Sequence, residues 1–436
     1  MLYFSGSLCQ YERMTELVQI LSDVQKQAFN TIEGTNANVL IMGQAGTGKS
    51  TFVNYLKSAS VKRIVCACPT AVSALNIGGQ TIHSLFQIQP RDFVMPEFLK
   101  LKAKTRNILV ATDVLIIDEI SMVAPDLLDA MDFLARSARH NNEPFGGIQI
   151  VAIGDLFQLP PVITNDATKY YKQEYGFENS YFFDSHVYAR SKFLRFSFDT
   201  VYRQNDGELL ENLVRLRNGD MQALEFFNKC KIDDATCRAN AVLITPYRAM
   251  AENINASRLA AIPAPEFAFT GVLEGNFSEK DVPAPMRLVL KVGALVVFVK
   301  NSDKWHNGSM GRVVEITARE IKVQLLNAAH TVVSVKPEKW EKIEYIRDEN
   351  DRLQEHEIGS YKQFPLNLGY AMTIHKAQGK TLDSVVVDIS RGAFAHGQTY
   401  VALSRTRAAR DMHVTSILRP RDVIFDERVL DFMNAE

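Results

Sequence analysis

The sequence predicts an α/β protein with two doubly wound parallel-sheet domains, a small β insertion in the second domain and a short insertion in the first. Apolar runs alternate with stretches of helical spacing in both halves of the chain, and a glycine-rich loop joins one such run to a helix. Short β-type segments interrupt the second half. We expect the first domain over residues 1–192, the second over 193–262 and 366–436, and the β insertion over 263–365.

Length and charge limit the possible classes of protein. A chain of 436 residues that is 46% hydrophobic is too long for one ordinary core but has enough apolar material for two to four domains. The formal net charge of −1 excludes binding to nucleic acid through a strongly basic surface as a whole. Any polyanion site must therefore be a local groove.

The five cysteines favour a cytosolic-type protein. They are odd in number and show neither a paired Cys-x-x-Cys framework nor histidines at zinc spacing, so we expect reduced thiols and no structural zinc. No apolar run reaches the roughly 18 residues needed to cross a bilayer. The first residues lack the basic and long apolar regions of a signal peptide.

The strongest motif lies at residues 43–50, where Gly-Gln-Ala-Gly-Thr-Gly-Lys-Ser separates an apolar strand from a helix. Its glycines let backbone N–H groups point at a polyphosphate, Lys49 would reach the β- and γ-phosphates, and the Ser50 hydroxyl would ligate Mg²⁺. The flanking strand and helix disfavour the alternative, a flexible glycine turn with a surface lysine. The predicted nucleotide contacts are Gly43, Ala45, Gly46, Thr47, Gly48, Lys49, Ser50 and Thr51.

Two later strands end in polar residues that suit phosphate chemistry. Residues 114–117 form an apolar run that leads into Asp118 and Glu119. Asp118 would hold Mg²⁺ and Glu119 would activate the attacking water, whereas an incidental acid pair is the alternative. The strand at 148–153 leads to Gln158, which we expect beside Glu119.

Two further features allow more than one interpretation. Gln25 lies in a helix that Ser22 can cap, and its amide could read an adenine edge, although a solvated helix glutamine is more common. Residues 87–104 mix Phe93, Met95 and Phe98 with basic residues and prolines. This segment is equally consistent with a projecting insertion and with an ordinary surface loop.

The β insertion reads as a small antiparallel barrel. The turn signal Asn307-Gly308 lies between two of its strands. The expected strands span residues 288–291, 294–300, 311–317, 321–326 and 331–335. Strands at 384–388 and about 411–415 then resume the α/β pattern.

Taken in order, these motifs resemble those of superfamily one helicases over the whole chain. The motifs are Gln25, the phosphate loop, 69–71, 118–121, 154–158, 202–203, 373–381 and 400–407. The stretch 126–139 followed by Pro-Phe-Gly-Gly at 144–147 is similar to the signature of the Pif-type branch, which is related to RecD. The same stretch also has the pattern of an amphipathic packing helix.

The resemblance implies a function and a more specific fold. It implies two RecA-like domains, an SH3-like barrel, and ATP hydrolysis coupled to 5′ to 3′ movement on single-stranded DNA and at DNA forks, with G-rich structured DNA as a further substrate. Arg203 and Arg405 would be arginine fingers. Tyr202, Gly379 and Lys380 would join the nucleotide site, and Gln158 would contact the γ-phosphate or the water.

The resemblance also implies DNA contacts on both lobes. Hydroxyls, a lysine and loop amides suit phosphate contacts without base readout. His83 alone would more often be a structural histidine. The implied contacts are Pro69, Thr70, Thr81, His83, Thr373, His375, Lys376 and Gln378.

Three competing classes fit less well. A GTPase switch needs Asn-Lys-x-Asp, and the Asn-Lys at 228–229 lacks the acid. A binding module that retains only the fold would not need Lys49 and Glu119, nor Arg203 and Arg405, and all four residues are present. The oppositely directed helicase branch usually has large insertions in both lobes, whereas the first insertion here is short.

Overall fold

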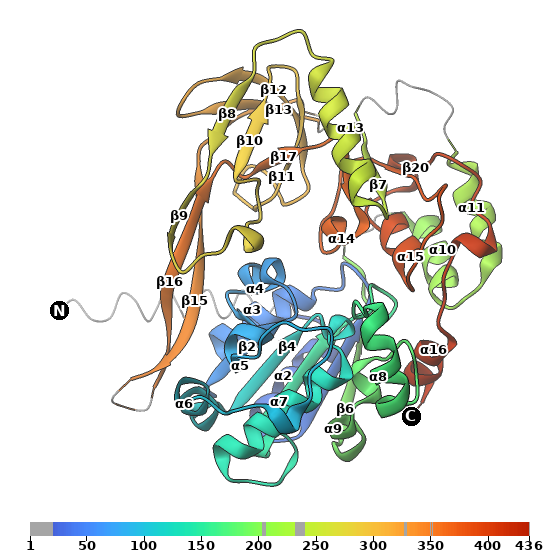
Figure 1. The fold of residues 1–436 in the computed structure, drawn as a ribbon. Helices are drawn as coiled ribbons and strands as arrows, with labels where there is room; N and C mark the ends of the chain where they lie inside the picture. The colour runs from blue at the N-terminus through green and yellow to red at the C-terminus, as the bar shows by residue number, and fades with distance from the viewer. Residues whose placement is uncertain are drawn as a thin grey trace. The chain divides into compact units, whose positions relative to one another are not determined.

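In the computed structural model, the chain divides into two compact units (Figure 1). The described residues are 21–202, 206–231, 240–326, 329–348, 350 and 352–435. The first unit contains residues up to 156, 160–202 and 342–357, and the second contains 157–159, 203–341 and 358–436.

The first unit is built around a six-stranded sheet in the order β3-β2-β4-β5-β1-β6, whose described pairs are all parallel. Its strands are β1 (Asn38–Gly43), β2 (Ile64–Cys68), β3 (Gln80–Thr81), β4 (Val114–Asp118), β5 (Gln149–Gly154) and β6 (Phe193–Phe198). Because the strands are parallel, the carboxyl ends of β1, β4 and β5 meet at one edge.

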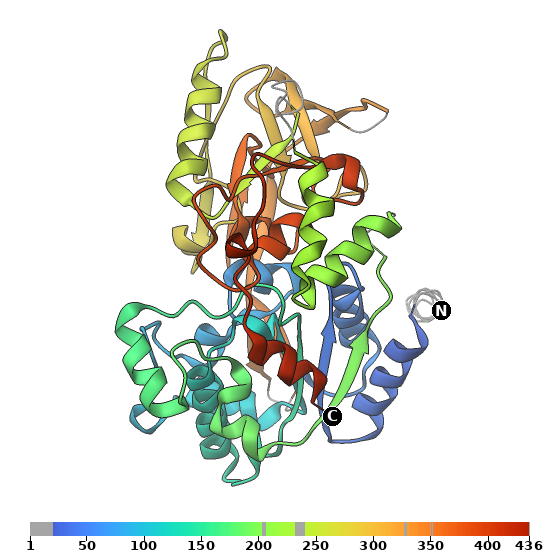
Figure 2. The ribbon, with the colours of Figure 1, turned by 90° about the vertical axis from the view of Figure 1, so that its right-hand side faces the viewer.

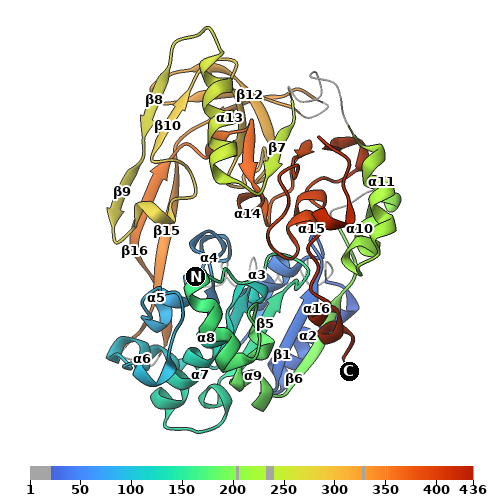
Figure 3. The same cartoon turned by 45° about the vertical axis from the view of Figure 1, so that its right-hand side comes forward.

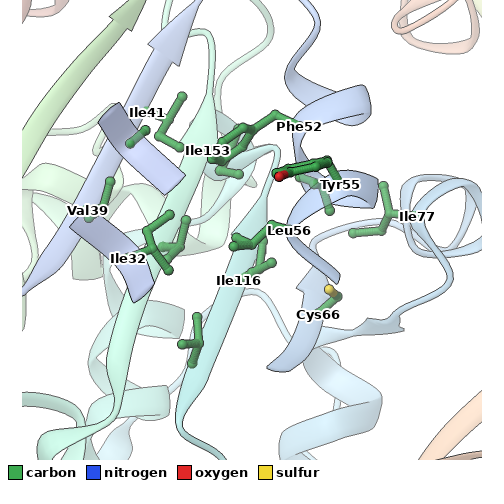
Figure 4. Packing of buried hydrophobic residues seen from close by; sticks show 14 of the residues in the cluster. Ile32, Val39, Ile41, Phe52, Tyr55, Leu56, Cys66, Ile77, Ile116 and Ile153 are labelled. Carbon is green, nitrogen blue, oxygen red and sulfur yellow. The ribbon is translucent and has the colours of Figure 1, made fainter. Parts of the chain in front are cut away.

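Apolar residues cover both faces of this sheet. On one face, Phe52 and Leu56 of α3 pack with Val39, Ile116 and Ile153 of three strands (Figure 4). Strand residues of the opposite face are also buried, as a doubly wound sheet requires. The helices of the first face are α2 (Asp23–Gly34), α3 (Lys49–Ala59) and α4 (Ala71–Ile77).

Further helices complete the first unit, and α7, α8 and α9 gather close together (Figure 3). These helices are α5 (Ile82–Phe86), α6 (Ala103–Ala111), α7 (Pro125–Arg139), α8 (Asn165–Tyr175) and α9 (His186–Arg190). The short 3-10 helices are η1 (Pro96–Phe98), η2 (Ile120–Met122), η3 (Pro144–Gly147) and η4 (Phe182–Asp184).

The second unit has its own parallel sheet, in the order β18-β7-β19-β20. Its strands are β7 (Val242–Thr245), β18 (Ala371–Thr373), β19 (Val385–Val387) and β20 (Met412–Val414). Its helices are α10 (Gly207–Arg217), α11 (Leu224–Lys229), α13 (Arg248–Ala260), α14 (Ile374–Ala377), α15 (Gln398–Leu403) and α16 (Glu427–Asn434), with short 3-10 turns η5 (Met221–Ala223), η7 (Ala409–Asp411) and η8 (Pro420–Asp422).

A β insertion interrupts this second α/β pattern after α13, which runs beside it (Figure 2). Its largest sheet has the order β14-β13-β12-β11-β17, and its described pairs are antiparallel. Leu259 of α13 joins the apolar core of this insertion. The strands are β8 (Phe267–Thr270), β9 (Val272–Gly275), β10 (Arg287–Leu290), β11 (Leu295–Phe298), β12 (Met310–Ile316), β13 (Ile321–Leu325), β14 (Val332–Val335), β15 (Glu338–Arg347), β16 (Leu353–Gln363) and β17 (Leu366–Leu368), with η6 at Glu279–Asp281.

The neighbouring strands β15 and β16 form a long ribbon that the sequence analysis missed. Residues 342–357 at its far end group with the first unit. There the hydroxyl of the buried Tyr345 accepts a 3.1 Å hydrogen bond from the Cys66 backbone N–H, and Lys57 pairs with Glu355 at 3.1 Å. This end of the ribbon is therefore held by specific polar contacts.

The structure confirms the predicted α/β class with a β insertion, and corrects two boundaries. Residues 366–368, which the sequence analysis placed in the second α/β domain, form β17, which pairs with β11 and belongs to the insertion's sheet. The sequence analysis placed residues 193–198 at the start of the second domain. They form β6, which pairs with β1 from Asn38 to Gly43 and therefore belongs to the first sheet. No helix in the described part of the chain is long and apolar enough to span a bilayer.

Candidate nucleotide and DNA site

The phosphate loop lies between the end of β1 and the start of α3. Gly46 and Gly48 have φ values of 87° and 82°, which favour glycine. A Cβ on Gly43 would lie 2.6 Å from the Thr47 hydroxyl and 2.9 Å from the Phe198 carbonyl oxygen, so the backbone packs too closely for a side chain. The loop therefore has the tight turn that polyphosphate binding requires.

The Lys49 ammonium lies over the loop. It donates to the carbonyl oxygens of Gly43 and Gln44 at 2.6 and 2.9 Å. Ser50 and Thr51 at the start of α3 are exposed, whereas Ala45 and Thr47 are buried. The lysine and both hydroxyl groups therefore come from the loop and the first turn of one helix.

Gln25 and Tyr202 lie beside the same loop. Ser22 caps α2, and the Gln25 amide accepts from the Ser22 N–H at 3.0 Å and donates to the Thr47 carbonyl at 3.2 Å. The Tyr202 N–H donates to the Gly46 carbonyl at 2.8 Å. A Cβ on Gly48 would lie 3.1 Å from the Gln25 amide nitrogen and 3.8 Å from the Tyr202 ring. Both predicted nucleotide contacts thus flank the phosphate loop, and Gln25 is not a solvated helix residue.

The predicted acids follow β4 directly. Asp118 is buried, and desolvation raises its pKa, whereas the Glu119 backbone N–H and the positive charge of Lys49 oppose that shift. Glu119 has φ 54° and ψ 46°, a left-handed conformation that is uncommon outside glycine. Such backbone strain is concentrated at functional sites. The buried Asp118 therefore suits metal binding, and the unusual backbone of Glu119 sets the direction of its carboxylate.

Gln158 follows β5, whose Ile153 pairs with Asp118 of β4. The Gln158 side chain is buried, and residues 157–159 group with the second unit. There a Cβ on Gly397 would lie only 2.4 Å from the Gln158 carbonyl oxygen. The proximity of Gln158 and Glu119 stays a prediction.

Of the second-unit residues predicted at the nucleotide, Gly379 and Lys380 lie in a loop after α14, whereas Arg405 follows α15. Arg405 is fully buried, and its guanidinium donates to the carbonyl oxygens of Val401, Ala377 and Lys380 at 2.6, 3.4 and 3.4 Å. Gly379 has φ 74° with nothing within 4 Å of an added Cβ. Arg405 thus organises the loop, and its predicted role as a finger is untested. Arg203 lies outside the described residues.

Three predicted DNA-binding threonines share one structural role. Thr70, Thr81 and Thr373 are the N-caps of α4, α5 and α14, and each hydroxyl oxygen accepts a hydrogen bond from an N–H in its own helix. Each cap lies at, or within two residues of, the carboxyl end of a strand in a parallel sheet. Capping is a sufficient structural reason for these residues, so DNA binding would be an additional role.

The remaining predicted DNA contacts differ in exposure. Lys376 and His375 are exposed, whereas Pro69, His83 and Gln378 are partly buried. Partial desolvation by neighbouring groups lowers the pKa of both histidines. Neutral imidazoles at physiological pH would contact phosphate through a hydrogen bond and without a full positive charge.

The insertion at 87–104 contains both packed and exposed aromatic residues. Phe93 stacks on Tyr170 of α8, with ring centroids 4.3 Å apart. Phe98 is 73% exposed and Met95 39% exposed. The segment lines a cavity of about 620 Å³, whose lining also includes the basic residues Arg91, Lys100 and Lys102. Phe93 is therefore structural, and Phe98 is the aromatic residue open to a ligand.

Buried acids on α7, whose structural role the sequence analysis missed, hold this insertion and the neighbouring helices α8 and α9 in place. Asp126 accepts from the Val94 N–H at 2.5 Å and the Tyr171 hydroxyl at 2.7 Å. Asp129 accepts from the Val187 N–H at 2.8 Å and the Tyr175 hydroxyl at 3.1 Å. Acids at the spacing 126, 129 and 132 on an apolar helix face were the available sequence signal.

The phosphate loop, the strand-end acids and the second parallel sheet with its β insertion define a P-loop nucleotide hydrolase of the two-sheet motor class. A sequence profile described as PIF1-like helicase matches residues 20–225. The chain is 31% identical to the ATP-dependent DNA helicase Pif1 of Bdellovibrio bacteriovorus, over 94% of this chain and 91% of that protein. It belongs to the PIF1-like helicase family.

Solved structures agree with this assignment. The chain is similar to Bacteroides sp Pif1 in complex with ADP-AlF4, with a TM-score of 0.87, 32% identity, and coverage of 95% of this chain and 96% of that one. Bacteroides Pif1 bound to ssDNA gives a TM-score of 0.67 at 32% identity, covering 94% of this chain and 96% of that one. The predicted helicase resemblance is confirmed.

Proposed function

We propose that this chain is an ATP-dependent DNA helicase that moves 5′ to 3′ on single-stranded DNA and separates the duplex ahead of it. The observation that carries the proposal is the left-handed backbone of Glu119, directly after the buried Asp118 at the end of β4. This strand belongs to the same parallel sheet as β1, which leads into the phosphate loop. Similarity to helicases of one family over more than 90% of both chains supports it.

In this mechanism the first unit supplies the phosphate chemistry. Lys49 exchanges its carbonyl partners for β- and γ-phosphate oxygens, and loop N–H groups hold the same phosphates. Glu119 orients the attacking water and accepts its proton. Gln25 and Tyr202 flank the loop, where an adenine edge and ring face would be read.

Ser50 and Asp118 are the residues that would hold a magnesium ion. An exposed hydroxyl at the start of α3 and a carboxylate at the end of β4 are hard oxygen donors, which Mg²⁺ prefers. The ion would neutralise charge that develops on the phosphates. The donor set fits a cation that is held mainly through water and nucleotide oxygens.

The second unit would couple this chemistry to movement. Arg203 and Arg405 are the proposed arginine fingers, which act only when they approach the γ-phosphate. Threonines, histidines and Lys376 at the starts of short helices would hold the DNA backbone in both units, with single-stranded DNA and forks as partners.

The test is ATP turnover with and without single-stranded DNA. Bound DNA would favour the state in which the fingers act, so we expect stimulation on the order of tenfold or more. Duplex without a tail should stimulate little. Equal turnover in all three conditions would contradict the proposed coupling, and Glu119→Gln controls for contaminating ATPase.

A further inference from the structure

The loop at 377–383, which carries Gln378, Gly379 and Lys380, is held from one side by Arg405. The guanidinium binds the carbonyl oxygens of Ala377 and Lys380, and the Leu382 N–H donates to the Arg405 carbonyl at 2.9 Å. These contacts fix both ends of the short segment that the nucleotide site would use.

The β insertion holds the same loop from another side, through the turn between β11 and β12. The Lys380 ammonium donates to the Asn307 side-chain oxygen at 3.0 Å. The Met310 N–H donates to the Asp383 carboxylate at 2.8 Å, and His306 lies 3.7 Å from that carboxylate. All of these residues belong to the second compact unit.

Gly308 shows how close this approach is. A Cβ at this position would lie 2.1 Å from the Thr381 carbonyl oxygen and 2.9 Å from its carbonyl carbon. Its φ of +104° is also unfavourable for other residues. The turn and the loop therefore meet backbone to backbone, and neither can shift alone.

We propose that the turn at Asn307 and Gly308 is a positioning element of the nucleotide site. This turn of the β insertion fixes the position of the loop at 377–383. The β insertion then influences ATP hydrolysis without touching the nucleotide. Any force that DNA exerts on the insertion would reach Gly379 and Arg405 through this contact. This inference rests on the ATPase activity proposed above.

Gly308→Ala tests the contact, and Gly293→Ala is its matched control. Gly293 also lies in the β insertion with a positive φ, +90°, but its nearest atom to an added Cβ is 3.9 Å away. Both variants therefore carry backbone strain, whereas only Gly308→Ala displaces Thr381. Asn307→Ala, which removes the bond to Lys380 without a clash, serves if Gly308→Ala does not fold.

The measurement is the kcat and KM of DNA-stimulated ATP turnover, with the melting temperature of each variant. We expect kcat to fall roughly 10- to 100-fold in Gly308→Ala, because small displacements of catalytic groups are costly, and to stay near wild type in Gly293→Ala. Asn307→Ala should lower kcat less, with little change in KM for ATP.

Equal kcat in Gly308→Ala and Gly293→Ala, at equal melting temperatures, would overturn the inference. A wild-type protein without ATPase activity would instead refute the proposed function, so the two failures are distinguishable.

Discussion

Glu119 is the residue whose geometry says most about the chemistry. Its left-handed backbone follows a fully buried strand. This conformation costs free energy in any residue other than glycine, and packing alone gives no reason for a glutamate there. Lys49, in contrast, lies in a regular helix and over its own loop. The two residues should therefore fail in different ways when they are replaced.

We predict that Lys49→Ala and Glu119→Gln both abolish ATP turnover but differ in ATP binding. Lys49 contacts ground-state phosphates, whereas Glu119 acts on the attacking water, so only the lysine variant should lose affinity. Each should lower kcat by roughly 10²- to 10⁴-fold. Titration with a fluorescent ATP analogue separates them, and an equal loss of affinity would refute these roles.

For individual residues, the sequence predicted which ones belong to the nucleotide site, but it could not reveal their structural roles. The order Gly-x-x-x-x-Gly-Lys-Ser was enough to place Lys49 and Ser50. The capping roles of Thr70 and Thr373, and the contact of Gln25 with Thr47, depend on backbone geometry that residue types alone do not specify.

Among the elements, the insertion at 87–104 divides into a packed part and an exposed part. Phe93 stacks on Tyr170, and Asp126 holds the neighbouring Val94 backbone, so the segment is anchored on α7 and α8. Phe98, in η1, is 73% exposed. An anchored segment with an exposed aromatic ring is suited to act as an obstacle at a DNA fork.

We predict that Phe98→Ala reduces duplex unwinding and leaves DNA-stimulated ATPase nearly intact. Phe93→Ala should instead lower stability by about 1–3 kcal/mol, because it removes a stacked ring. Thermal melting and a strand-separation assay distinguish the two. Phe177, which is 43% exposed in the same unit, gives the control variant Phe177→Ala. Equal unwinding by Phe98→Ala and Phe177→Ala would place the obstacle elsewhere.

The ribbon of β15 and β16 shows why some elements escaped prediction. Its residues alternate only weakly between buried and exposed positions, and much of its surface is charged. A strand pattern is strong when one face is fully buried. Here only a few residues, such as Tyr345, find a partner surface, and that surface is distant in sequence.

For the whole molecule, the fold class could be predicted because apolar parallel strands and the phosphate loop are local signals. The membership of β6 in the first sheet could not, since its residues at 193–198 are separated from β1 by most of the first unit. The contact between the Asn307 turn and the loop at 377–383 is likewise long-range. Such pairings arise from topology, which short motifs do not encode.

The direction of movement tests the central claim most directly. We would measure ATP-dependent strand separation on two duplexes of equal length, one with a 5′ and one with a 3′ single-stranded tail, with Glu119→Gln as the inactive control. We predict that wild-type protein separates the 5′-tailed duplex and leaves the 3′-tailed duplex paired. Separation of the 3′-tailed duplex alone, or of neither while DNA still stimulates ATP turnover, would contradict the account.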